Sequence, residues 1–294
     1  MGLFQRAGLI LDCHVHLLPP RRLLKLIEWA RRFFPGHPVP ETIALEELLA
    51  EFEAQGIRAL LNFAHAIFPD ETDVLNRFNH ELATRYPQVL PVGTLHPESP
   101  EPLLVVSQCL DEYGFLGLKF HAFVQKFLPW EPRMRPVYEA VAARGRLLYF
   151  HTGFEAFYGG PLPVAGWAEL LAGIPPTPIV LAHDCFPHFE AAFELLDRHP
   201  HLYLDIVNTL SPLAAMWLSG QDLEERRRVL REGVEAFPDR IMFGSDHPAG
   251  LGGLAQIYRD FDDFGLSDRA RAALLGGTAR RLIERVAPGR LRRL

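Results

Sequence analysis

The chain has 294 residues, of which 48% are hydrophobic, and its formal net charge at pH 7 is -6. This length suits one large α/β barrel or two smaller domains, and the acidic balance argues against general binding to nucleic acid or anionic membranes. The sequence shows neither a secretory leader pattern nor a long uncharged apolar run, so we expect a cytoplasmic protein that acts on a small molecule. Its three cysteines have no CxxC spacing and are expected to be reduced thiols.

Short apolar runs alternate with segments of helical periodicity along the whole chain. The apolar runs predict eight strands, at Leu9–Leu17, Ala59–Phe63, Val89–Leu95, Phe115–His121, Leu147–His151, Ile179–His183, Leu202–Ile206 and Ile241–Gly244. Apolar residues three and four positions apart predict helices between them, including Asp73–Tyr86, Pro136–Arg144, Phe189–His199 and Leu223–Phe237. Eight such units are typical of a (β/α)8 TIM barrel of the α/β class. Because no linker divides the chain, we predict a single domain over residues 1–294.

Three connections that follow predicted strands are longer than the usual length of about two to six residues. The first, residues 18–56, contains helical stretches at Arg21–Phe34 and Ile43–Gln55, and we interpret this insertion after strand 1 as a candidate lid. The connections after the fourth and fifth strands are rich in aromatic residues, including Phe123, Phe127, Trp130, Phe154, Phe157 and Tyr158. Such connections rise from the catalytic face of a barrel, so their composition indicates a partly apolar substrate.

Two histidines two positions apart stand in the first predicted strand. Because side chains alternate between the faces of a regular strand, Asp12, His14 and His16 are expected on one face. We interpret the two imidazoles as a pair that can share a divalent ion, and Asp12 as a deeper hydrogen-bond partner. A lone HxH pair also occurs in ordinary cores, so it needs support from the rest of the chain.

That support comes from the ends of later strands. His151 and His183 end the fifth and sixth predicted strands, and Asp246 follows the eighth. Catalytic residues of a barrel stand at these carboxyl ends, and imidazole nitrogen with carboxylate oxygen suits a borderline cation such as zinc. A bound ion lowers the pKa of its water, and Asp246 is placed to be both a ligand and a base.

The motifs DCHVHL, GLKFH, YFHTG, LAHDC, FGSDHP and LLGGTARRLI follow one another in this order over nearly the whole chain. In this order they resemble the amidohydrolase superfamily, in particular its amidohydrolase-related (amidohydrolase 2) branch of metal-dependent hydrolases, decarboxylases and hydratases. The last motif departs from the usual GGNA at Thr278, which is a structural position. The motifs are specific to the superfamily and not to one substrate.

The resemblance implies roles for the five polar residues. His14, His16, His151 and Asp246 match the metal ligands. His183 matches a histidine that acts beside the metal in mononuclear members and binds a second ion in binuclear ones. We therefore expect Asp246 and His183 to be the catalytic residues that handle protons.

The number of metal ions depends on the fourth strand, where Lys119 matches the position at which binuclear relatives can carry a carboxylated lysine. We favour one Zn²⁺ ion, with Mn²⁺ or a second ion as alternatives. The residues that would hold a second metal or the substrate are Lys119, His183, His121 and Asn208.

Other polar residues receive supporting roles. Asp184 and Asp205 are predicted to orient ligand imidazoles, and His65 and His96 follow strands two and three and could reach the pocket. An arginine that holds a substrate carboxylate would favour a lyase. Its candidates are Arg133, Arg135 and the arginines of the first long connection.

The leading hypothesis is a metal-dependent hydrolase that cleaves an amide, ester, lactone or related bond with a metal-activated water. The alternative is a decarboxylase or hydratase of the same superfamily that acts on an aromatic or muconate-type carboxylic acid. A barrel that binds a ligand without catalysis is less consistent with the intact ligand set. We leave open whether the chain forms a homodimer.

Overall fold

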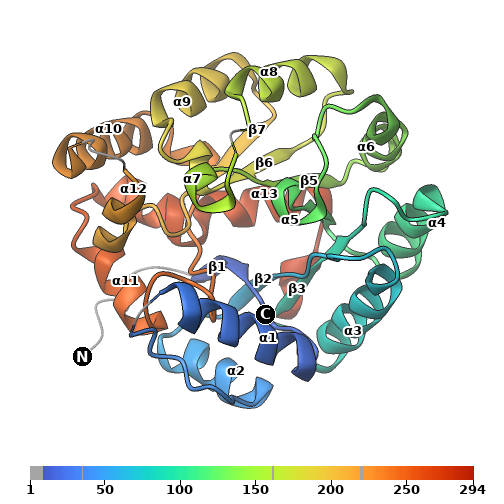
Figure 1. Ribbon diagram of the computed structural model, residues 1–294, viewed down its shortest axis with the longest axis horizontal. Coiled ribbons are helices and arrows are strands. Elements are labelled where there is room, and N and C mark those ends of the chain that lie inside the picture. Colours follow the sequence, from blue (N-terminus) through green and yellow to red (C-terminus); the bar gives the residue numbers. More distant parts are fainter. Residues whose placement is uncertain (1–8, 35, 161, 219–221) are drawn as a thin grey trace.

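The computed structural model describes residues 9–34, 36–160, 162–218 and 222–294. Within these ranges eight strands form one sheet in chain order, each parallel to the next. The strands are β1 Leu11–Val15, β2 Ala59–Phe63, β3 Val89–Thr94, β4 Gly117–Phe120, β5 Leu147–His151, β6 Ile179–Ala182, β7 Leu202–Asp205 and β8 Ile241–Met242. Figure 1 shows them at the centre of a ring of helices. The predicted single-domain TIM barrel is confirmed.

Helices alternate with the strands. They are α1 Pro20–Phe33, α2 Leu45–Ala54, α3 Glu71–Arg85, α4 Pro102–Ser107, α5 Ala122–Gln125, α6 Arg135–Ala143, α7 Glu155–Tyr158, α8 Val164–Gly173, α9 Phe189–Arg198, α10 Leu223–Ala236, α11 Leu254–Asp262, α12 Asp268–Ala272 and α13 Thr278–Val286. Inward side chains of the strands pack with one face of α13, where Ala279, Leu282 and Ile283 are buried. Helix α13 lies behind the strands in Figure 1, so it covers the end of the barrel opposite α1 and α7.

The barrel closes where β8 meets β1. The backbone N–H of Cys13 donates to the Phe243 carbonyl at 3.1 Å, that of His16 donates to His247 at 2.9 Å, and that of Asp246 donates to His14 at 2.8 Å. The approach is close, because a Cβ on Gly244 would lie 2.6 Å from the His14 backbone nitrogen. Glycine fits at position 244, in this seam between β8 and β1, because it has no Cβ.

Strand β1 carries a bulge that the sequence did not predict. Asp12 pairs with Leu60 and Val15 with Asn62, so β1 has one more residue than β2 between these two points. Asp12 consequently points outward, where the Tyr258 hydroxyl of α11 donates to its carboxylate at 3.1 Å. The expectation that Asp12 shares the face of His14 and His16 is wrong, because the extra residue interrupts the alternation.

The insertion after β1 folds as expected into α1 and α2. Pro20 begins α1, a position where its missing N–H costs no hydrogen bond. Leu23, Ile27 and Ala30, spaced by four and three residues, form its buried face. Figure 1 shows α1 in front of β1 and β2, with α5 and α7 facing it across the centre of the view.

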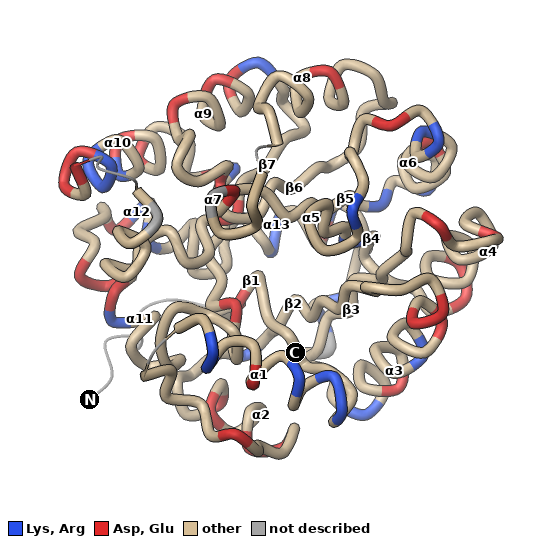
Figure 2. Tube along the Cα trace, viewed as in Figure 1, with Lys and Arg blue, Asp and Glu red and all other residues tan. Residues whose placement is uncertain are grey.

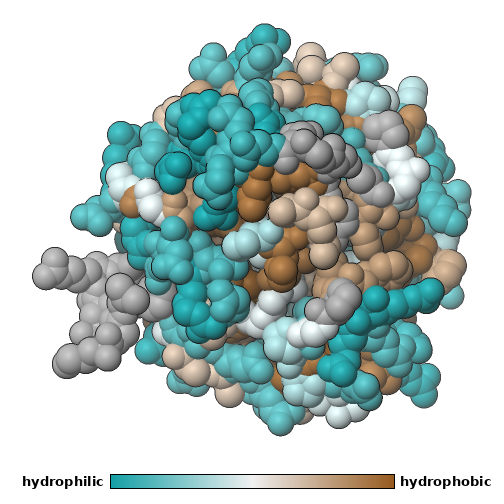
Figure 3. Space-filling view, turned by 60° about the vertical axis from the view of Figure 1, so that its left-hand side comes forward, coloured by the Kyte–Doolittle hydropathy of each residue, from teal (hydrophilic) through white to brown (hydrophobic). Residues whose placement is uncertain are grey.

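Charged residues belong mainly to the outer helices, and few belong to the strands (Figure 2). In the face shown in Figure 3, hydrophilic side chains surround apolar ones that gather near the centre. Cys13, Cys109 and Cys185 are buried and unpaired, as predicted. In the part of the chain that the structure describes, none of the helices has the length and apolar character needed to cross a membrane.

Candidate metal centre and active site

His14 and His16 are each fixed through one ring nitrogen. His14 Nδ1 lies 2.7 Å from Asp205 Oδ2, and His16 Nδ1 lies 3.0 Å from the Phe63 carbonyl. Since a carbonyl can only accept, Nδ1 of His16 donates to Phe63, and its Nε2 is directed at Asp246. Burial lowers the pKa of His14 well below its ordinary value, which also favours the neutral, metal-binding form.

Asp246 brings its carboxylate to the same point from the loop after β8. Its Oδ1 lies 2.9 Å from His16 Nε2 and 3.6 Å from His14 Nε2. Among the described residues, these three form the one group of potential ligands whose donor atoms all lie within 4.8 Å of one another. The donor set of two imidazoles and one carboxylate fits zinc or a similar divalent ion.

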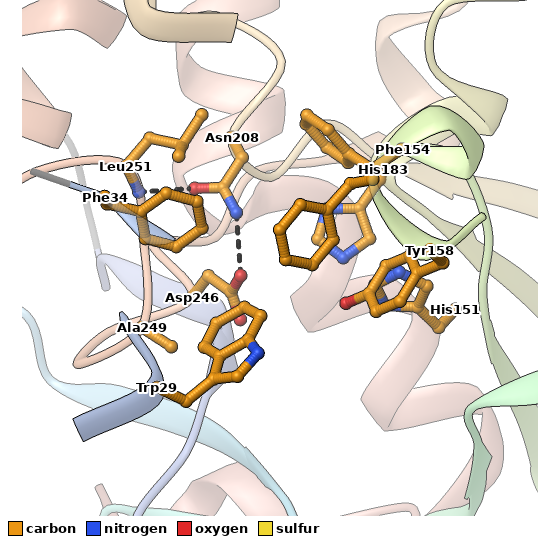
Figure 4. Close-up of a pocket in the computed structure, with 11 residues that line it drawn as sticks. Trp29, Phe34, His151, Phe154, Tyr158, His183, Asn208, Asp246, Ala249 and Leu251 are labelled. Carbon is orange, nitrogen blue, oxygen red and sulfur yellow. Dashed lines mark hydrogen bonds between the residues drawn. The ribbon is translucent and has the colours of Figure 1, made fainter. Parts of the chain in front are cut away.

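Asn208 orients the outer oxygen of this carboxylate. Its amide donates to Asp246 Oδ2 at 2.7 Å and accepts from the Leu251 N–H at 2.9 Å, as Figure 4 shows. Both Asn208 and Asp246 have positive φ angles, of 65° and 60°, a strained conformation that is frequent at functional sites. Burial raises the pKa of Asp246, but hydrogen bonding from His16 and nearby positive charge outweigh it and hold this pKa below its ordinary value.

His183, in the turn after β6, and His151, at the end of β5, face the cavity beside Asp246. His183 Nδ1 lies 3.1 Å from the Val207 carbonyl and therefore carries the proton. Burial lowers the pKa of His183 to about 4, so its Nε2 is an unprotonated acceptor near neutral pH. His151 Nε2 is buried without a hydrogen-bond partner. This nitrogen without a partner is suited to binding a metal, although His151 is not part of the group formed by His14, His16 and Asp246.

Six imidazoles form a closed ring around the mouth of the barrel. Neighbouring ring centroids are 3.7 to 5.8 Å apart in the order His14, His16, His65, His121, His151 and His183. His121 stacks on His151 at 3.7 Å, and its Nε2 lies 3.3 Å from the Tyr158 hydroxyl. The structure thus brings His65 and His121 to the same cavity as the predicted ligands.

Lys119 lies below this ring, between two aromatic side chains. Its ammonium nitrogen is 4.4 Å from the Tyr149 ring centroid and 4.8 Å from that of Phe63, and it has no hydrogen-bond partner. Burial lowers the pKa of Lys119 to about 7, although Asp205 and Asp246 oppose the shift. The Tyr149 hydroxyl donates a hydrogen bond to Asp205, whose carboxyl group also contacts His14 Nδ1.

Two connected hollows meet at this centre. The larger has a volume of about 260 Å³ and extends toward the ends of β2 and β4. The smaller, of about 40 Å³, is drawn in Figure 4 and has mainly apolar walls, with Phe34, Phe154 and Leu251 beside His183 and Asp246. Trp29 and Tyr158 line both hollows.

Some predicted residues lie elsewhere. His96 Nδ1 accepts from the Glu98 N–H, and His96 lines neither hollow. Arg133 and Arg135 pair with glutamates at the surface. Asp205 holds a ligand imidazole as predicted, whereas the Asp184 carboxylate is buried with no hydrogen bond to an imidazole.

Other lining residues were not singled out from the sequence. Trp29 and Phe34 reach the site from α1 and the residue after it. Tyr149, within β5, lines neither hollow but contacts Asp205 and Lys119. The helical and strand patterns of the sequence predict only that such side chains are buried in the core. Only the path of α1 over the mouth shows that Trp29 and Phe34 face a cavity.

An eight-stranded barrel with imidazoles and a carboxylate at the carboxyl ends of its strands has the arrangement in which TIM-barrel enzymes place a catalytic metal. The chain belongs to the amidohydrolase family, because the family model described as Amidohydrolase matches residues 11–285. No curated protein matches the chain in sequence.

Solved structures share the fold at low sequence identity. An uncharacterized TIM-barrel protein, Bb4693 from Bordetella bronchiseptica, is 20% identical with a TM-score of 0.72, over 95% of this chain and 99% of that one. The 5-carboxyvanillate decarboxylase from Novosphingobium aromaticivorans DSM 12444, complexed with manganese, is 16% identical with a TM-score of 0.67, over 96% and 97%. A probable 2-pyrone-4,6-dicarboxylic acid hydrolase from Acinetobacter baumannii is 13% identical with a TM-score of 0.64, over 94% and 99%.

Proposed function

We propose that this protein is a metal-dependent hydrolase that cleaves an amide, ester, lactone or related bond of a small, partly apolar substrate. The convergence of His14, His16 and Asp246 donor atoms within 4.8 Å carries the proposal. His151 is the fourth ligand, since its buried Nε2 has no other partner. A set of three imidazoles and one carboxylate favours a single zinc ion, with manganese as the alternative.

The bound ion supplies a water of lowered pKa. Asp246 remains ionised because its pKa is held below the ordinary value, so its carboxylate can accept a proton. Asn208 fixes the orientation of that carboxylate through Oδ2. His183 presents an unprotonated Nε2 to the cavity. There this nitrogen can accept a hydrogen bond from the attacking water, or accept its proton and pass that proton to the leaving group.

A decarboxylase is the second candidate, because Arg22 of α1 lines the larger hollow and can hold a carboxylate. The 5-carboxyvanillate decarboxylase that shares the fold acts on such an acid. In that case the residues described above would direct a proton to a substrate carbon, and carbon dioxide would leave.

The test is a screen of the zinc-loaded and the manganese-loaded protein against lactones, amides, esters and aromatic or muconate-type carboxylic acids. Product carboxylate and carbon dioxide are measured separately. A hydrolase gives new carboxylate without carbon dioxide, and release of carbon dioxide establishes the second candidate instead.

Variants and metal analysis test the site itself. His14→Ala and Asp246→Ala are expected to lose bound metal and to reduce kcat/KM by at least about a hundredfold, whereas the exposed His188→Ala should leave both unchanged. Protein that binds no stoichiometric metal, or ligand variants with wild-type activity, would falsify both enzymatic readings.

A further inference from the structure

Tyr158 places a hydroxyl group in the cavity that the reaction proposed above does not use. It is the last residue of the short helix α7 and lines both hollows, as His151 and Asp246 do. Figure 4 shows its hydroxyl oxygen directed into the smaller hollow, across from Asp246. Burial and the negative charge of Asp246 raise the pKa of Tyr158 above its ordinary value. The hydroxyl therefore keeps its proton near neutral pH and is a potential hydrogen-bond donor.

Aromatic contacts hold the Tyr158 ring in place. The ring stacks on Phe123, with centroids 4.7 Å apart and 8° between the planes. It meets His151, the proposed fourth ligand, edge to face at 5.2 Å, and Phe157 in the same way at 4.9 Å. These contacts use the ring and leave the oxygen atom free for other partners. A donor fixed in this manner needs no reorganisation when charge develops opposite it.

His121 leaves the hydroxyl proton of Tyr158 available. His121 Nε2 lies 3.3 Å from the Tyr158 oxygen, whereas its Nδ1 is buried without a partner among the described residues. Burial lowers the pKa of His121 well below its ordinary value, so the neutral ring carries one proton. Buried N–H groups without an acceptor are rarer than buried acceptors without a donor, which favours this proton on Nε2. His121 then donates to Tyr158, and the O–H of Tyr158 can point into the hollow.

Acceptor atoms surround the rest of this position. His183 presents an unprotonated Nε2 and Asp246 an ionised carboxylate. The Asn208 amide directs its N–H to Asp246. Lone pairs and negative charge on these groups would repel a substrate oxygen that becomes negative during the reaction. Such an oxygen needs a donor, and the hydroxyl of Tyr158 supplies one on the opposite wall.

We propose that Tyr158 is a catalytic residue whose hydroxyl donates a hydrogen bond to the substrate carbonyl oxygen. When water adds to the carbonyl carbon, the new C–O bond forms and the π electron pair moves to the carbonyl oxygen. The hydrogen bond stabilises the negative charge there, and Tyr158 keeps its proton throughout. The inference rests on the proposed function, because hydrolysis forms this tetrahedral oxyanion and decarboxylation does not.

Calorimetric titration of the full-length, zinc-loaded protein tests this role with two anions. Methylphosphonate is tetrahedral, like the oxyanion, and acetate is planar, like the ground state. Tyr158→Phe removes one oxygen and keeps the ring contacts, so the fold and the zinc content should not change. We expect the variant to bind methylphosphonate about tenfold more weakly, as loss of a charge-assisted hydrogen bond does, and to bind acetate at most about threefold more weakly.

Kinetics give a second measurement, on the ester, lactone or amide that the screen identifies. Removal of one donor to an oxyanion lowers kcat by about a hundredfold or more. Tyr158→Phe should therefore lower kcat by about a hundredfold while KM stays within about threefold of the wild type, because the bond is made mainly in the transition state. A rise in KM with unchanged kcat would overturn the role, since it would show that the hydroxyl only binds the substrate.

Tyr113→Phe is the matched control, because its hydroxyl accepts from Gln108 and lies outside both hollows. It should bind both anions like the wild type. Unchanged methylphosphonate affinity in Tyr158→Phe, equal loss for the two anions, or loss of zinc overturns the role of Tyr158 and leaves the metal-dependent hydrolase intact. Wild-type protein that takes up zinc but binds no methylphosphonate does the same. Wild-type protein that takes up no zinc overturns both proposals.

Discussion

At the scale of single residues, the site depends on which nitrogen of each imidazole carries the proton. His14, His16 and His183 each place Nδ1 against an oxygen that the fold fixes, namely the Asp205 carboxyl and the carbonyls of Phe63 and Val207. The Nε2 atoms of all three rings therefore face the cavity. Such outer partners set the orientation and basicity of metal ligands.

Asp205→Asn tests this arrangement. Burial raises the pKa of Asp205 to about 8, so this carboxyl group can ionise and polarise the His14 ring when His14 binds a cation, whereas an amide of the same size cannot. We expect zinc affinity to fall by about tenfold to a hundredfold, measured by competition with a chelator. Asp197→Asn, at an exposed position on α9, is the matched control, and unchanged affinity in Asp205→Asn would contradict the role of Asp205.

Lys119 gives a prediction for stability as a function of pH. Its pKa is about 7 in the folded protein, because of burial, against an ordinary value of 10.5. The unfolded chain therefore binds more protons than the folded one between these pH values, and the free energy of unfolding rises with pH across this window.

Lys119→Met removes this dependence. In metal-free protein, the variant should have a higher unfolding temperature than the wild type near pH 6, and the difference should shrink by pH 9. Thermal unfolding followed by circular dichroism measures both, with Lys126→Met as the exposed control. A difference that grows with pH would show that Lys119 is stabilised, rather than penalised, as an ammonium group.

At the scale of elements, α1 and α7 come from different connections and meet over the mouth. Phe157 of α7 lies 5.6 Å from the Trp29 ring and 5.2 Å from the Phe33 ring, both in edge-to-face geometry. The same Trp29 lines both hollows. We propose that this aromatic contact holds the insertion of residues 18–56 closed as a lid.

Phe157→Ala should loosen the lid. Each aromatic pair is worth about 0.5–1.5 kcal/mol, and the variant removes two of them. We therefore expect amide hydrogen exchange in α1 to become roughly fivefold to a hundredfold faster. Exchange in β4 and β5 should stay unchanged. Phe68→Ala, which removes an aromatic residue that is 61% exposed, is the control. Unaltered protection of α1 would refute the lid.

The strands were the most predictable elements because each is an apolar run buried on both faces, as parallel barrel strands are. The ends of the strands were less predictable. His183 falls outside β6, in a turn where it has a φ of 61°, and β8 stops at Met242. No residue type in β1 indicates the bulge that turns Asp12 outward, so the sequence does not predict it. Arg22 and Lys119 line the same hollow only because of the path of α1, which the sequence does not show.

At the scale of the whole molecule, three of the four predicted ligands lie on the two sides of the seam that closes the barrel. His14 and His16 belong to β1 and the residue after it, and Asp246 to the loop after β8. Val15 and His247 form the single isolated bridge between them in the described chain. A bound ion would add bonds between the first and last strands of the barrel.

Chelation of the metal should therefore loosen the seam before the rest of the fold. We expect faster amide exchange at Cys13, His16 and Asp246, whose N–H groups donate across the seam, and a lower unfolding temperature. The ladder between β2 and β3, which carries none of the proposed ligands, serves as the internal control. Uniform loss of protection would mean that the ion stabilises the molecule as a whole and not the seam.

The outward turn of Asp12 connects the outermost layer of the protein to its chemistry. One oxygen of this carboxyl accepts from the N–H groups of His14 and Ser245, at 3.1 and 3.0 Å, and the other accepts from Tyr258. A single buried side chain thus links β1, the loop that carries Asp246 and helix α11. A shift of α11, on the outside of the barrel, would be transmitted through two hydrogen bonds to the backbone of both ligand segments.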